Sequence, residues 1–314
     1  MELFLQRIIN GTANGVIYST IALALVIVYR ATGLLNVAQG ELSTMSTYVS
    51  LVLHTKATPA LAGTGFAAAL VPFTPWPWWA CIVGGMVFGA LLAVVVEFLV
   101  IRRVAARSGF AVISATVGML LLLNGLVERI WRPVVRGVPP AFPNAPADYL
   151  SVGGARLRYL TIGTVATIAV TLALLWLLLR FTKLGLAFRA VSSVPEVSRL
   201  VGIRPGRVTS VGWAIAGAIG ALAGALVAPT VLLEPQMMVR VLIFSLVAAT
   251  VGGLDSLGGS IIGGVFIGLA QTMIGGYVGF IGSSLSLPGA LALMIAILLY
   301  RPTGLFGTRR VERV

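Results

Sequence analysis

The sequence predicts an all-α integral membrane protein, a polytopic helical bundle of about 8–10 transmembrane helices, some of them broken or rich in glycine. Charged residues make up only 10% of the 314 residues, whereas a soluble domain usually carries about 25%. The mean hydropathy is +1.03. The apolar runs are continuous and about 20 residues long, as a membrane helix requires, and lack the alternation of barrel strands. We expect one transmembrane domain over residues 1–314.

The apolar runs predict roughly nine crossings. In chain order, the expected spans are 8–29, 36–53, 78–100, 110–130, 159–179, 208–231, 241–254, 260–280 and 287–300. The mildly apolar run 60–73 is expected to be an additional interfacial or re-entrant piece. Several glycine pairs stand four residues apart, for example Gly85 and Gly89 or Gly264 and Gly268, which indicates close helix packing.

Basic residues predict the orientation, because cytoplasmic loops carry an excess of lysine and arginine. They cluster near Arg102, between Lys183 and Arg207, and in the tail after Arg301, which places the N-terminus outside and the C-terminus in the cytoplasm. The proline-rich loop Arg132–Arg158 is then an irregular external segment. The net charge of +13 is accounted for by this topology, so we expect no nucleic-acid partner.

The scarcity of reactive residues argues against an enzyme, a metal site or a cofactor. Cys81 is the single cysteine and His54 the single histidine, so an internal disulfide or a multi-histidine metal site is not expected. A Ser–His pair would need His54, which is expected at a helix end in an interfacial role. An aspartyl intramembrane enzyme would need two membrane aspartates, but of Asp148 and Asp255 the first lies in a loop. No phosphate-binding G-x-x-x-x-G-K-[ST] loop is present, so ATP would have to be hydrolysed by a partner.

Residues 33–48 (GLLNVAQGELSTMSTY) form a polar stretch within a membrane protein. Because polar groups at membrane depth are costly unless they face a cavity or a partner, one interpretation is a helix that lines a translocation path or caps a broken helix. The other places the stretch in the cytoplasmic headgroup layer just after Arg30. The candidate path residues here are Asn36, Gln39, Glu41, Ser43 and Thr44.

Residues 251–264 (VGGLDSLGGSIIGG) interrupt two apolar runs with glycine pairs and one acid. Asp255 and Ser256 are therefore candidates for the path as well, or they cap a tight turn between two helices. Broken helices in the two halves of a chain are typical of a site at a repeat interface. Residues 36–48 and 252–264 are a candidate pair of this kind.

Residues 183–207 predict a short amphipathic helix on the cytoplasmic side. Ser193 is its expected N-cap, and Val197, Leu200 and Val201 form an apolar stripe before Gly202 ends the helix. Such a helix is suited to a groove in a partner protein.

Four motifs in this order resemble permease subunits of high-affinity branched-chain amino-acid ABC importers. They are Arg30 with GLLNVAQGE at 33–41, GLAFRA with LVGI over 185–203, GGLDSLGGSIIGG at 252–264 and RPTGLFG at 301–307. The resemblance implies half of a translocation pore in a bacterial plasma (inner) membrane. It also implies a second related permease subunit, two cytoplasmic ATPase subunits and an extracytoplasmic solute-binding protein.

The resemblance further implies an ATPase-coupling loop at 185–202, with a coupling helix over 190–202. Its expected coupling residues are Pro195, Glu196, Val197, Arg199, Leu200, Val201 and Gly202. Glu196 matches the family signature, while Ser193 and Pro195 depart from it.

Two alternatives stay open at this point. One is an ABC permease for another small neutral solute such as urea or a short amide. The other is an ion-coupled secondary transporter in which Glu41, Glu97 and Asp255 carry the ion.

Overall fold

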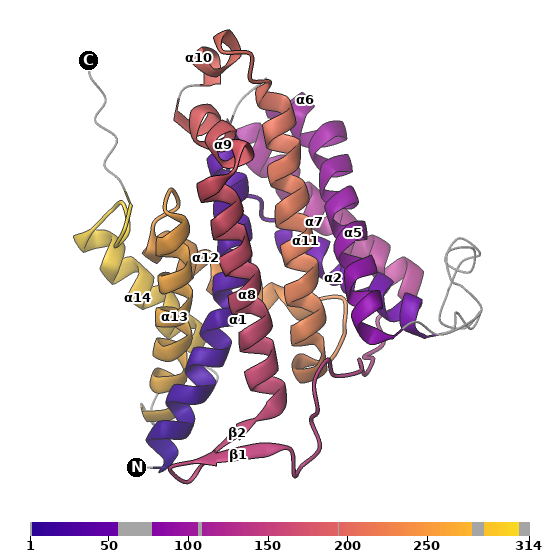
Figure 1. Cartoon of the computed structure of the whole chain (residues 1–314), viewed down its shortest axis with the longest axis vertical. Coiled ribbons are helices and arrows are strands. Elements are labelled where there is room, and N and C mark those ends of the chain that lie inside the picture. The colour runs from indigo at the N-terminus through magenta and orange to yellow at the C-terminus, as the bar shows by residue number, and fades with distance from the viewer. Residues whose placement is uncertain (1, 56–76, 106–108, 194, 278–285, 308–314) are drawn as a thin grey trace.

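Helices make up most of the computed structural model, which describes residues 2–55, 77–105, 109–193, 195–277 and 286–307 (Figure 1). The elements are α1 (Glu2–Thr32), α2 (Gln39–His54), α5 (Trp78–Val96), the π-helical turn η1 (Glu97–Ile101), α6 (Arg102–Ala105), α7 (Gly109–Trp131), β1 (Tyr149–Val152), β2 (Ala155–Arg158), α8 (Tyr159–Phe181), α9 (Lys183–Ser193), α10 (Pro195–Leu200), α11 (Pro205–Val231), α12 (Met237–Gly252), α13 (Leu257–Tyr277) and α14 (Ser286–Tyr300).

Six helices of this described part are long and apolar enough to cross a membrane, and α12 and α14 are shorter apolar helices. These eight helices and the 16-residue α2 correspond to the nine expected spans. The all-α membrane fold is thus confirmed. The expected interfacial piece at 60–73 lies outside the described residues.

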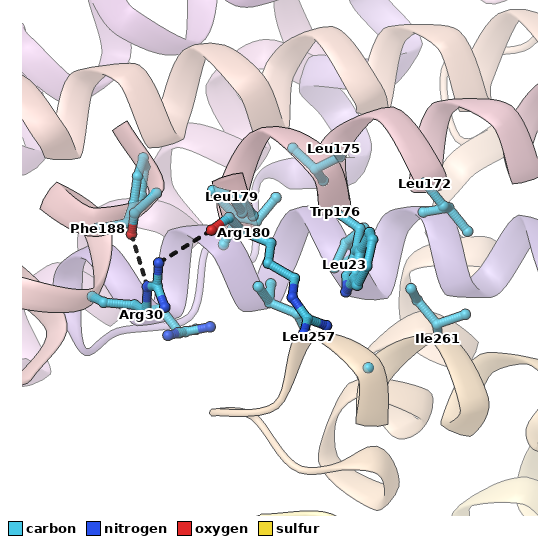
Figure 2. Close-up of a pocket in the computed structure, with 14 residues that line it drawn as sticks. Leu23, Arg30, Leu172, Leu175, Trp176, Leu179, Arg180, Phe188, Leu257 and Ile261 are labelled. Atoms are coloured by element: carbon cyan, nitrogen blue, oxygen red, sulfur yellow. Dashed lines mark hydrogen bonds between the residues drawn. The ribbon is translucent and has the colours of Figure 1, made fainter. Parts of the chain in front are cut away.

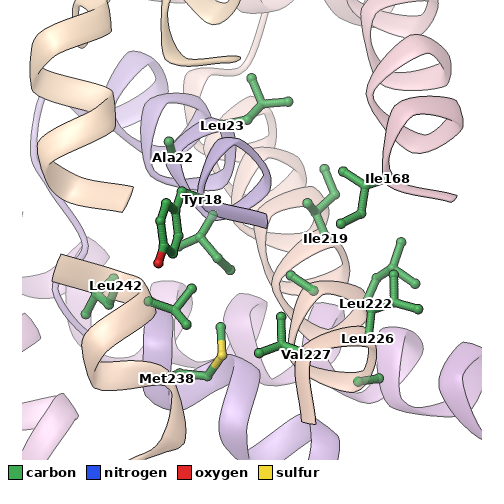
Figure 3. Packing of buried hydrophobic residues seen from close by; sticks show 14 of the residues in the cluster. Tyr18, Ala22, Leu23, Ile168, Ile219, Leu222, Leu226, Val227, Met238 and Leu242 are labelled. Carbon is green, nitrogen blue, oxygen red and sulfur yellow. The ribbon is translucent and has the colours of Figure 1, made fainter. Parts of the chain in front are cut away.

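Helices α1 and α11 form the centre of the bundle and run in opposite directions (Figure 1). The Thr209 hydroxyl near the start of α11 donates a hydrogen bond to the carbonyl of Ala31 near the end of α1, at 3.4 Å. Figure 3 shows that core side chains converge from both central helices and from α12, among them Tyr18, Leu222 and Met238.

The chain after α1 and the chain after α11 follow the same plan. Helix α1 is followed by Gly33 at φ 73°, and α11 is followed by Leu232 at φ 67°. In both places a short linker then leads into a helix of 16 residues, α2 in the first half and α12 in the second. Helices α2 and α12 are therefore structural counterparts.

Helices α5 and α13 are counterparts as well, because each carries the same glycine pattern. Gly84 and Gly85 are followed by Gly89 in α5, and Gly263 and Gly264 are followed by Gly268 in α13. A Cβ on Gly89 would lie 2.8 Å from the carbonyl oxygen of Gly217 in α11, so a larger residue would push the two helices apart. Gly268 is packed in the same way against Gly15 of α1.

The two halves are thus inverted repeats in which α1, α2 and α5 correspond to α11, α12 and α13. Helices α7 and α14 complete the correspondence, because α7 packs against α2 and α14 packs against α12. They meet where α2 and α12 begin, since a Cβ on Gly40 would lie 3.5 Å from the Cβ of Met238. The sequence-based pairing of 36–48 with 252–264 is therefore wrong. The counterpart of the polar stretch is the start of α12, because the repeat follows helix order, not polarity.

The two ends of the bundle differ in structure and charge. At the end where α1 begins, β1 and β2 form an antiparallel hairpin with Val152 opposite Ala155. Gln6 of α1 accepts a bond from the backbone N–H of Arg156 at 2.8 Å, which ties the hairpin to the bundle. The opposite end carries α6, α9 and α10 (Figure 1), and we call it the basic end for the arginines of 102–103 and 183–207.

The segment Arg132–Arg158 was expected to be irregular, but its last ten residues form the β1–β2 hairpin. Its turn is formed by Gly153 and Gly154, which adopt φ 57° and 85°. Two consecutive positive φ values match the two-residue turns that connect hairpin strands. The five prolines of the segment all precede β1, where they are compatible with irregular chain.

Candidate functional site

The polar stretch before α2 caps that helix from inside the protein. The side-chain oxygen of Asn36 accepts a bond from the N–H of Ala38 at 3.1 Å, and its amide donates to Gln39 at 3.1 Å. Gln39 in turn donates to the carbonyl of Ala216 in α11 at 2.9 Å. Asn36 and Gln39 are both buried within the protein.

The hydroxyl groups of α2 bond to the backbone of their own helix. Ser43 donates to the carbonyl of Gln39 at 2.9 Å, and Thr44 donates to that of Gly40 at 3.2 Å. A Cβ on Gly220 of α11 would meet the Ser43 hydroxyl oxygen at 2.6 Å. Ser43 therefore takes part in close helix packing, and a place for Ser43 and Thr44 along a translocation path stays a prediction.

Glu41 differs from its neighbours because its carboxylate contacts another helix. Its side chain is 2% exposed, and Asn124 of α7 donates to its Oε2 at 3.4 Å. The same Asn124 amide donates to the carbonyl of Pro235 in the linker before α12, at 3.3 Å. Glu128, one turn further along α7, lies within electrostatic range of Glu41. This group of side chains joins α2, α7 and the start of α12 at the repeat interface.

Asn124 was not among the residues singled out from the sequence. The sequence does contain a pattern that could have identified it, because the polar residues Asn124 and Glu128 interrupt the apolar run of α7. Polar residues within a membrane helix usually face other protein segments or a cavity.

Asp255 and Ser256 lie far from Glu41, in the turn between α12 and α13 at the basic end. The Ser256 hydroxyl accepts a bond from the N–H of Gly259 at 3.0 Å, as an N-cap does. The whole of α12, about 24 Å at 1.5 Å per residue, separates this turn from Pro235 and Glu41. The structure therefore does not gather the candidate path residues into one site.

The structure describes two helices in the expected coupling segment, where the family resemblance implied one over 190–202. Helix α9 ends at Ser193 and α10 begins at Pro195, a residue that suits the first turn of a helix. Pro195, Glu196 and Val197 form the first turn of α10. Gly202 adopts φ 81°, and its N–H donates to the carbonyl of Arg199, which ends the segment.

The end of α10 and the turn that follows it present apolar side chains to the surface. Leu200 is 87% exposed and Val201 is 73% exposed, while Ser198 is buried. Arg199 is exposed beside them. Apolar side chains this exposed, at the basic end and outside the membrane spans, are typical of a contact surface for another protein.

A polar network joins the end of α5 to the beginning of α11 next to that surface. Arg102 donates two hydrogen bonds to the carboxylate of Glu97, each 3.0 Å long, and further bonds to the carbonyl of Gly206 and the hydroxyl of Ser210. The Ser210 hydroxyl also lies 2.8 Å from Glu97 Oε2. Glu97 begins the π-helical turn η1, a local widening of the helix that often accompanies functional positions. Because both oxygens of the Glu97 carboxylate are bonded to other side chains, Glu97 is poorly suited to carry the ion of a secondary transporter.

A family model described as the permease component of branched-chain amino acid transport systems matches residues 7–300. The high-affinity branched-chain amino acid transport system permease protein LivH of Escherichia coli K12 is 27% identical, with 99% of this chain and 98% of that protein covered. The probable branched-chain amino acid transport permease protein LivH of Methanocaldococcus jannaschii is 28% identical over 94% of this chain and 91% of its own length. A solved structure of PsaBC from Streptococcus pneumoniae in complex with Fab aligns over 96% of this chain and 92% of that chain, at 15% identity and a TM-score of 0.43.

Proposed function

This chain belongs to the family of permease components of branched-chain amino acid transport systems, and we propose that it is the transmembrane permease subunit of an ABC importer for branched-chain or related small amino acids. It forms half of the translocation pore together with a second, related permease subunit. Two cytoplasmic ATPase subunits hydrolyse the ATP, and an extracytoplasmic solute-binding protein delivers the substrate. The chain itself is a non-catalytic subunit of a bacterial plasma membrane.

The observation that carries this proposal is the exposed apolar end of α10, formed by Leu200 and Val201, in a family member without a phosphate-binding loop. Such a chain needs a partner that hydrolyses ATP, and α10 offers that partner an apolar contact. The decisive experiment is reconstitution with the ATPases and the solute-binding protein. We expect uptake of leucine, isoleucine or valine that requires ATP and persists when the proton gradient is collapsed. Uptake that requires the gradient would support an ion-coupled transporter, and uptake of urea or short amides alone would change the substrate.

The basic end is proposed to face the cytoplasm, which places the N-terminus and the β1–β2 hairpin outside. In a Cys81→Ala background, a membrane-impermeant thiol reagent applied to whole cells should label Ala147→Cys, which is exposed in the loop before β1. It should not label Thr182→Cys, which is exposed at the basic end, until the membrane is permeabilised. The reverse pattern would overturn the orientation.

Glu41 is proposed to act in the translocation path, at the interface between the repeats. Replacing Glu41 by leucine removes one of the two acceptors of the Asn124 amide, and the loss of one such hydrogen bond is worth roughly a factor of ten. We expect Glu41→Leu to lower uptake by about tenfold at normal membrane levels, with Glu41→Gln retaining more activity. The matched control is Ser114→Leu, a polar residue on the exposed face of α7. Normal uptake by Glu41→Leu would leave only a packing role.

A further inference from the structure

A cavity of about 460 Å³ lies at the basic end, between α1, α8, α9 and the first turn of α13 (Figure 2). Asp255 and Ser256 form the turn that leads directly into α13, and the first residues of α13 line the cavity. The cavity and this turn therefore lie at the same end of the bundle. The cavity is thus separate from the Glu41 and Asn124 group at the start of α12.

The part of the cavity that lies deeper in the bundle is apolar. Leu23 of α1 faces Leu172 and Leu175 of α8 across it, and Ile261 of α13 lies on the lower side (Figure 2). Ile27 of α1 also lines this part. On the α8 side the cavity is bordered by Trp176 and Arg180, which are both exposed. The cavity therefore opens at the outer surface of α8, the least buried of the long apolar helices in the described part of the chain.

The part nearest the basic end carries three arginines, Arg30, Arg180 and Arg189. The Arg189 guanidinium donates to the carbonyl of Gly185 at 3.4 Å and to that of Arg180 at 3.3 Å. Arg180 lies over the ring of Trp176, with 4.9 Å between its Cζ and the ring centroid. Asp255 acts electrostatically on Arg30 from the turn before α13, so the acid and the three bases leave a positive excess.

The first turn of α13 adds to this positive potential. Leu257 and Gly258, the first two residues of that 21-residue helix, line the cavity. The N-terminal end of a helix carries partial positive charge and attracts anions.

We propose that this cavity binds an anionic phospholipid from the leaflet at the basic end of the bundle. An acyl chain would lie along the leucines of α1 and α8, and the phosphate would meet Arg30, Arg180 and Arg189. Basic pockets between membrane helices on the cytoplasmic side bind anionic head groups for the same electrostatic reason. The chain's own tail is a poor occupant, because Arg309, Arg310 and Arg313 give it the same sign of charge.

Lipid bound in this cavity would contact α9, and α9 is followed directly by α10 of the coupling segment. Lipid binding could therefore affect the position of α10. Only this consequence rests on the proposed transport function. Lipid binding itself depends on the cavity alone, so its test and the transport test fail or succeed separately.

The test is native mass spectrometry of the purified full chain, titrated with phosphatidylglycerol, phosphatidylcholine, glycerol phosphate or inorganic phosphate. We expect phosphatidylglycerol to bind more tightly than the other three. The double variant Arg30→Gln with Arg180→Gln should lose about 30-fold in affinity, because each basic group near an anionic lipid contributes a factor of about five. Arg103→Gln, an exposed arginine of α6 outside the cavity, should bind normally.

A second variant tests the cavity without altering its charges. Gly258 lines the cavity, and a Cβ on it would meet no other atom within 4 Å, so Gly258→Phe adds bulk at the cavity wall without a backbone clash. We expect it to abolish phosphatidylglycerol binding, whereas Ala173→Phe on the exposed face of α8 should not. Equal binding of phosphatidylcholine, equal binding of free phosphate, or unchanged affinity in both cavity variants would each overturn the proposal.

Discussion

Replacing Leu200 by aspartate is expected to separate the permease from its ATPase partners while leaving insertion into the membrane intact. Leu200 is 87% exposed, so the substitution removes little packing within this chain. In the complex, the same change would place an unpaired charge among apolar contacts. Buried anchors of an interface are worth about 2 kcal/mol or more, so the affinity for the ATPase should fall at least about 30-fold. The measurements are co-purification of the ATPases and substrate-stimulated ATP hydrolysis.

Two comparisons make that result specific. Arg199→Ala should mainly slow association, because charges at the rim of an interface act chiefly on encounter and orientation. Leu150→Asp alters an exposed leucine of the hairpin at the other end of the bundle and should leave ATPase binding unchanged. If Leu200→Asp leaves both ATPase binding and hydrolysis intact, α10 is not the coupling element.

The long helices could be predicted from the sequence because crossing a bilayer imposes a simple requirement on each segment separately. An apolar run of sufficient length is read from the residues alone, and α1, α5, α7, α8, α11 and α13 all meet that requirement. The shorter α2 was also expected as a helix. Its environment was not predictable, because the polarity of Ser43 and Thr44 suits a lipid headgroup layer, a cavity or a glycine-lined helix contact equally well.

Contacts and symmetry between segments that are distant in the chain could not be predicted from the sequence alone. The contact of Asn124 with both Glu41 and Pro235 depends on how α7 packs against two other helices. The inverted repeat was obscured because many more residues separate α2 from α5, among them 56–76, than separate α12 from α13. Polar composition suggested one pairing of segments, whereas helix order and the shared glycine pattern establish another.

Replacing Arg102 by methionine is expected to destabilise the junction between α5 and α11 more than replacing its partner Glu97 does. The two side chains differ in exposure, with 40% for Arg102 and 2% for Glu97. Arg102→Met leaves a buried carboxylate without its counter-ion, and breaking a buried ion pair costs roughly 3 kcal/mol or more. Glu97→Met leaves an arginine that still bonds to Gly206 and reaches water, so the loss should be smaller. Thermal unfolding of the purified permease would measure both effects.

The double variant Arg102→Met with Glu97→Met separates charge burial from loss of shape. Replacing both members of a buried pair by apolar residues is often close to neutral, so the double variant should be more stable than Arg102→Met alone. Because the same network holds the start of α11, which follows the coupling segment, Arg102→Met should also weaken ATPase co-purification. Leu200→Asp, in contrast, should weaken co-purification without lowering the unfolding temperature. Equal destabilisation by the two single variants, or a double variant less stable than both, would show that the pair acts through packing and not through its charges.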